Sequence, residues 1–211
     1  MYSLVYLRRM IINQKPARVD YTVGSETNSI YYERAGFEGS YDEVTTQLRD
    51  IFESDNVNVI TTSDFNPLSS KRIFAPQAIS AALAGYTFNA ETRASLLSFV
   101  MRLPPLVVRL YPMQRYAFQD NSAYMKMHMM YQQNGVLRMQ NYISQSENSR
   151  DEMIRLRVMM ATYILGLIAP LNSSAQQKSI RTQQINTQRD EKKKSGKVSI
   201  LTRLINRIRG L

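Results

Sequence analysis

The chain has 211 residues, 27 Lys and Arg against 17 Asp and Glu, and a net charge of +10, a length that fits one domain with or without an appendage. Its 44% apolar content is typical of a folded protein and too high for a wholly disordered chain. The absence of cysteine excludes disulfide bridges, a thiol nucleophile, iron–sulfur clusters and cysteine-based zinc sites, and a single histidine excludes a histidine-rich metal centre. The large positive charge favours an anionic partner, either nucleic acid or a membrane surface.

The N-terminal third is predicted to form β-strands. Residues 2–12 are rich in Tyr, Val, Leu and Ile, and residues 19–23 alternate apolar with polar side chains, which is the two-residue period of a half-buried strand. A third strand is predicted at 29–33, and a later one at 58–62. Because short turns separate the first three segments, the sequence predicts an antiparallel meander.

Local capping signals predict three helices. Ser40 and Glu43 match a capping box, and Asn89 can cap a helix at 90–103 that two prolines end. Pro76 suits the first turn of a helix at 77–84, which a glycine can terminate. The helix after Ser40 is expected to bury one face at helical spacing, made of Tyr41, Val44, Leu48, Ile51 and Phe52.

The second half of the chain is predicted to be mostly helical. Residues 120–143 allow a hairpin around Asn134-Gly135 or two helices, and we favour helices because Met, Gln and Lys are good helix formers. A second capping box at Ser149 opens a helix predicted over 149–169, whose later part is apolar nearly all round and should be buried or contact another subunit. Residues 106–111 form a short apolar run that fits a strand or an extended link.

The positive charge is concentrated at the C-terminus. Residues 1–171 carry 17 basic and 15 acidic side chains, a net charge of +2, whereas residues 172–211 carry 10 basic and two acidic ones, a net charge of +8. Residues 172–186 are rich in Gln, Asn, Ser and Thr, as in a linker. The sequence therefore predicts a nearly neutral α+β body over 1–171 and a basic, amphipathic C-terminal arm over 172–211.

The arm combines cations with an apolar stripe. Its basic side chains are candidate nucleic-acid or anion-binding residues: Lys178, Arg181, Arg189, Lys192, Lys193, Lys194, Lys197, Arg203, Arg207 and Arg209. Its apolar side chains are predicted to contact a partner or a membrane: Leu201, Leu204, Ile205 and Ile208. A basic amphipathic helix can lie on an anionic bilayer, dock into a partner's groove or fold back on its own body, and a solvated charge run without a partner is the structural alternative.

Two further segments have a functional and a structural interpretation. Residues 109–118 interleave Arg109 and Arg115 with three aromatic residues, which suits single-stranded nucleic acid, or else forms a corner whose rings pack inward. Residues 125–130 place four methionines around His128, which could ligate Cu(I) but is more often a core or an adaptable contact surface. We therefore expect no metal there.

Catalysis has little support in the sequence. No glycine-rich phosphate loop follows a predicted strand, and His128 lacks a nucleophile motif. The paired carboxylates at 42–43 and 151–152 fall in first helical turns, where negative charge complements the helix dipole. A hydrolase built on scattered carboxylates is the enzymatic alternative. We expect no enzyme activity, cofactor or small-molecule substrate.

No targeting signal is evident, and the longest apolar stretch, 158–169, falls short of the roughly 20 residues that span a bilayer. The protein is therefore expected inside the cell or inside a particle, neither secreted nor transmembrane. The leading hypothesis is a structural or assembly protein, compatible with a virus or phage particle, that contacts other protein subunits through its body and nucleic acid or a neighbouring subunit through its arm. The alternative is a peripheral, matrix-like membrane protein whose arm lies on an anionic bilayer.

Overall fold

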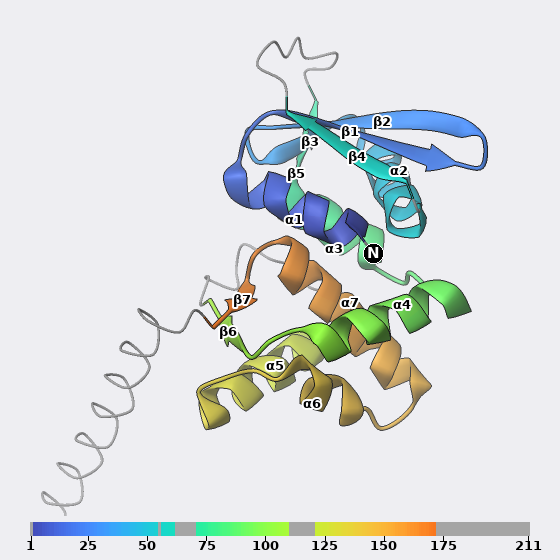
Figure 1. The fold of residues 1–211 in the computed structure, drawn as a ribbon. Helices are drawn as coiled ribbons and strands as arrows, with labels where there is room; N and C mark the ends of the chain where they lie inside the picture. The colour runs from blue at the N-terminus through green and yellow to red at the C-terminus, as the bar shows by residue number, and fades with distance from the viewer. Residues whose placement is uncertain (1, 55, 62–70, 110–120, 172–211) are drawn as a thin grey trace, which may run out of the picture. The chain divides into compact units, whose positions relative to one another are not determined.

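A computed structural model describes residues 2–54, 56–61, 71–109 and 121–171 (Figure 1). The helices within these residues are α1 (Tyr2–Asn13), α2 (Tyr41–Glu53), α3 (Ala75–Leu83), α4 (Ala90–Arg102), α5 (Asn121–Asn134), α6 (Met139–Ser144) and α7 (Ser149–Ile164). The strands are β1 (Ala17–Val23), β2 (Glu26–Glu33), β3 (Gly36–Glu38), β4 (Val57–Thr61), β5 (Arg72–Phe74), β6 (Leu106–Val108) and β7 (Ile168–Pro170). The α+β fold with an N-terminal antiparallel sheet, predicted from the sequence, is therefore confirmed.

In the described residues, the first five strands form one antiparallel sheet of order β4-β1-β2-β3-β5. Helices α1, α2 and α3 cover one face of it (Figure 1). Burial alternates along β1, where Ala17, Val19 and Tyr21 face the helices. The alternation that predicted this strand thus reflects one covered sheet face.

The two tight turns of the meander differ in their residues. Gly24 begins the two-residue turn between β1 and β2 with φ of 59°, which suits glycine. The turn between β2 and β3 uses Arg34 and Ala35 at φ of 50° and 63°, although left-handed positions usually carry Gly or Asn. Without that signature, strand β3 could not be found in the sequence.

The strand predicted at 2–12 is wrong, because these residues form helix α1. Leu4, Leu7 and Met10 are buried and recur every three residues, which places them on one helical face. A strand would instead have aligned Leu4 and Met10 with Arg8. The helix ends where Gln14 adopts φ of 52°.

The capped helices form as predicted. Ser40 and Glu43 make both hydrogen bonds of the capping box, at 3.3 and 3.0 Å, and the Asn89 side chain accepts from the Thr92 N–H at 2.7 Å. Four of the five residues expected on the buried face of α2 are buried, but Tyr41 is 45% exposed, because it lies at the first helical position beyond the edge of the core.

The two helices α5 and α6 occupy the segment for which a hairpin or two helices were predicted, so the hairpin is wrong and the favoured helical prediction is confirmed. Gly135 follows α5 with φ of 69° and ends the helix. The 106–111 run contributes strand β6 as far as Val108, and β6 pairs with β7.

Helix α7 is shorter than the predicted 149–169. Its N-cap is Asn148, which accepts from the Asp151 N–H at 2.9 Å, so the capping box expected at Ser149 is wrong by one residue. It ends at Ile164 because Gly166 turns the chain with φ of 70°, and Ile168–Pro170 then pairs with β6. Its residues from Val158 onward are mostly buried, and α7 contacts α1, α3, α5 and α6.

Candidate anion site and protein-contact edge

The end of α7 receives an arginine from α1. The Arg8 guanidinium carbon lies 4.5 Å from the centroid of the Tyr163 ring, and Nη1 donates a hydrogen bond to the Tyr163 carbonyl. The chain just after α7 passes close to α1, since a Cβ added to Gly166 would lie 2.9 Å from Cγ1 of Ile12. Arg8 is half-buried, and the carbonyls at the end of α7 give its charge a favourable dipole.

A second arginine reaches the same place from β6. The Arg109 N–H donates to the Leu167 carbonyl at 2.7 Å, four residues beyond Tyr163, and the Arg109 side chain is exposed. Burial lowers the pKa of Arg8, the Tyr163 hydroxyl raises it, and the positive charge of Arg109 lowers it further. Two like charges therefore lie close enough to repel, and such a concentration of positive charge attracts an anion.

Neither Arg8 nor Arg109 takes part in any ion pair within the described residues. Arg155 provides a reference for this difference. Its guanidinium carbon lies 5.2 Å from the Tyr142 ring centroid, its Nη1 donates to the Tyr142 carbonyl at 2.6 Å, and its Nε donates to Asp151 at 3.0 Å. Arg155 thus has the same two tyrosine contacts as Arg8, together with a carboxylate.

A cleft runs between α1 and the edge strand β4. It has a volume of about 370 Å³, and its lining is apolar and basic: Tyr6, Arg9, Met10, Asn13, Lys15, Ala17, Val59 and Thr61. No acidic residue is among the described residues that line it. On the opposite face of β4, Ile60 is 38% exposed, and Val5 and Ile12 are exposed on α1.

Strand β4 has an unpaired edge within the described sheet. The Thr22 N–H donates to the Asn56 carbonyl at 3.2 Å, and hydrogen-bonded pairs recur at every second residue along an antiparallel ladder. The backbone groups of Asn58 and Ile60 therefore point toward β1. Those pointing away from β1, to the edge, belong to Val57, Val59 and Thr61.

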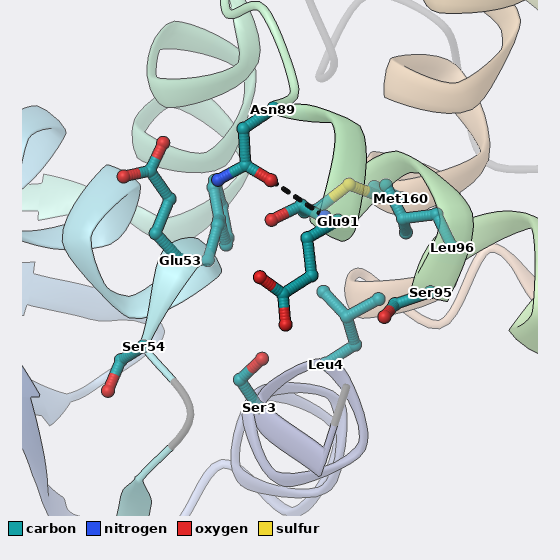
Figure 2. A pocket seen from close by; sticks show the side chains of 11 residues that line it. Ser3, Leu4, Glu53, Ser54, Asn89, Glu91, Ser95, Leu96 and Met160 are labelled. Atoms are coloured by element: carbon teal, nitrogen blue, oxygen red, sulfur yellow. Dashed lines mark hydrogen bonds between the residues drawn. The ribbon is translucent and has the colours of Figure 1, made fainter.

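A polar pocket lies where α1, α2, α4 and α7 meet (Figure 2). Glu91 projects into it, whereas Glu53 lines its edge and accepts a hydrogen bond from the Tyr86 hydroxyl. The Asn89 side chain at its rim is engaged in capping α4. The cavity of about 80 Å³ has room for several waters, well below the roughly 300–1,000 Å³ of a small-molecule site.

The methionine-rich segment divides between core and surface. Met127 is fully buried, whereas Met125 and Met129 are exposed one helical turn apart. Within the described residues, no group of three His, Asp or Glu side chains is placed to hold a metal ion. No described helix combines the length and apolar character needed to cross a bilayer.

Of the residues predicted to bind an anion, the structure describes Arg109 and places it beside Arg8. Arg115 and every named residue of the 172–211 arm lie outside the described residues. Sequence reasoning missed Arg8 and Tyr163 as site residues, because 155 positions separate them and no local pattern joins them. No family model, curated protein or solved structure matches the chain.

Proposed function

We propose that the protein is a non-enzymatic structural or assembly protein, of the kind that builds a virus or phage particle. Residues 1–171 contact other protein subunits, and the basic residues of 172–211 bind nucleic acid or a neighbouring subunit. The observation that carries the proposal is the unpaired edge of β4 beside the cleft under α1.

An unpaired strand edge with apolar surroundings favours the addition of a strand from another chain. The outward backbone groups of Val57, Val59 and Thr61 supply main-chain hydrogen bonds, and the cleft supplies a pocket for side chains. Proteins that remain monomeric commonly protect such an edge with lysine, proline or a bulge. The described residues of β4 contain none of these.

The composition supports the same proposal. The chain contains 13 Tyr and 12 Met, residue types that supply adaptable contact area. Three methionines are exposed among the described residues: Met101, Met125 and Met129. Exposed side chains of this kind suit repeated contacts between subunits.

The edge is tested by Ile60→Lys in the full chain, with sedimentation velocity as the measurement. A lysine on an edge strand disfavours strand addition, so self-association should weaken by about tenfold or more. Phe74→Lys is the matched control, because Phe74 is 47% exposed on β5, the opposite edge of the described sheet. A wild-type protein that stays monomeric, or equal effects of the two lysines, would contradict assembly through β4.

The arm is tested by replacing Lys192, Lys193 and Lys194 together with Gln. Binding to a single-stranded oligonucleotide should weaken, and the slope of log K against log salt should fall by roughly 2, since each neutralised phosphate adds about 0.7. The only lysines of 1–171 provide a matched triple control: Lys15, Lys71 and Lys126. Wild-type binding to anionic vesicles without binding to the oligonucleotide would instead favour a peripheral membrane protein.

A further inference from the structure

Arg8 has more hydrogen-bonding capacity than the described structure uses. A guanidinium carries five N–H donors, and Arg8 directs one nitrogen to the Tyr163 carbonyl. Arg49, which also meets a helix end, directs Nε and Nη2 to the carbonyls of Ala82 and Ala84. A role limited to covering the end of α7 does not account for the remaining donors of Arg8.

A structural role also does not account for the neighbouring charge. Where an arginine stacks on a tyrosine purely for packing, as Arg155 does on Tyr142, a carboxylate neutralises it. At Arg8 the charge that acts on the guanidinium is that of Arg109, another cation. The Arg8 guanidinium donates to the Tyr163 carbonyl, and the backbone N–H of Arg109 donates to the Leu167 carbonyl just after α7. Among the described residues, no carboxylate pairs with Arg8 as Asp151 pairs with Arg155.

We propose that Arg8 and Arg109 together bind one phosphate group of a nucleic-acid backbone, a site in the body that is separate from the arm. The proposal rests on the nucleic-acid part of the proposed function. Two adjacent guanidiniums can each donate to a different oxygen of a phosphodiester, which gives short, charge-assisted hydrogen bonds. Tyr163 holds Arg8 in place through the ring contact, so less side-chain freedom is lost on binding.

The sequence around Arg109 favours nucleic acid over a lipid headgroup. Arg109 begins the 109–118 stretch, in which arginines alternate with aromatic residues, the composition of single-strand binding segments. Arg8 is half-buried against Tyr163, whereas its neighbour Arg9 on the same helix is exposed. A flexible backbone phosphate can reach a half-buried guanidinium more readily than the headgroups of a flat bilayer.

The test uses the full chain with Arg8→Gln and Arg109→Gln combined, and fluorescence anisotropy of a labelled single-stranded oligonucleotide. We expect affinity to fall about tenfold and the salt slope to fall by about 0.7, the value for one phosphate. The matched control is Arg102→Gln with Arg150→Gln, which likewise removes two arginines of the body, both of them exposed, and should change affinity by no more than about twofold. Arg8→Lys should restore part of the affinity lost by Arg8→Gln, because it keeps the charge but not the fork of donors.

A second measurement needs no variant. In the wild-type protein, titration with the same oligonucleotide should shift the amide NMR signals of Arg8, Tyr163 and Leu167 and leave those of Tyr142 and Arg155 unchanged. Equal losses in the two double variants, without these shifts, would overturn the site while leaving binding by the arm in place. No oligonucleotide binding by the unaltered chain would overturn both this site and the nucleic-acid part of the proposed function. Loss of binding only to phosphatidylserine-containing vesicles would overturn the assignment to nucleic acid.

Discussion

Two regions of the molecule place an arginine over a tyrosine ring and against that tyrosine's carbonyl, but they differ in what surrounds the charge. Around Arg155, which is 3% exposed, the carboxylate of Asp151 lies one helical turn away on the same helix. Around Arg8, which is half-buried, the charged neighbour is Arg109. A carboxylate neutralises the guanidinium of Arg155, whereas no described carboxylate neutralises that of Arg8.

The difference shows in the titration of the groups involved. Burial alone would raise the pKa of Asp151, but hydrogen bonds from Arg155 and the Glu147 N–H, with the charges of Arg155 and Lys126, outweigh it and hold the pKa below its ordinary value. Because that pKa is depressed on folding, Asp151 stabilises the protein above its ordinary pKa and loses this effect as pH falls through the folded value. Arg8 shows the opposite tendency, since its charged form is disfavoured by burial and by Arg109.

The largest effect is expected from Arg155→Leu. It leaves Asp151 without its partner at a mostly buried position, so the free energy of unfolding should fall by about 3 kcal/mol, measured by urea denaturation at neutral pH. The destabilisation should shrink below the ordinary pKa of Asp151, because the protonated carboxyl no longer needs the guanidinium.

Arg8→Leu is the matched control for Arg155→Leu. It removes the same two tyrosine contacts but also relieves the repulsion by Arg109, so the free energy of unfolding should change by no more than about 1 kcal/mol. If the two substitutions destabilise equally, Arg8 is a structural arginine like Arg155 and the comparison fails.

Local signals in the sequence predicted much of the fold. The caps at Ser40 and Asn89 lie within three residues of the groups that they satisfy, and the helices after them begin where predicted. Helix α1 was misassigned because its β-branched residues resemble a strand, whereas its buried spacing depends on contacts with elements far along the chain. The end of α7 depends on the pairing of Ile168 with Val108, which no local pattern encodes.

The candidate anion site was predictable only in part. Arg109 was identified because arginine and aromatic residues alternate after it. Arg8 and Tyr163 are separated by 155 residues, so their contact follows from the packing of α1 on α7 and has no local signature. Asp151 and Arg155, by contrast, stand four residues apart and could be paired from helix geometry alone. The pairing of Asp151 with Arg155 thus follows from the sequence, whereas the tyrosine contacts of Arg155 and of Arg8 emerge only in the folded chain.

The smallest expected effect is on the titration of Tyr163. Burial raises the pKa of Tyr163 and the positive charge of Arg8 partly offsets this, so Arg8→Gln should raise the pKa further. The folded pKa of Tyr163 lies above its ordinary value of about 10, so the neutral phenol stabilises the fold fully below about pH 10. This stabilisation is lost as the pH rises through the folded pKa. In Arg8→Gln the stabilisation should be lost at a higher pH. The measurement is the ¹³Cζ chemical shift of Tyr163 against pH, assigned with Tyr163→Phe. A phosphate bound at Arg8 should raise the same pKa in the wild type and leave it unchanged in Arg8→Gln, and a wild-type pKa that does not respond would count against a shared phosphate site.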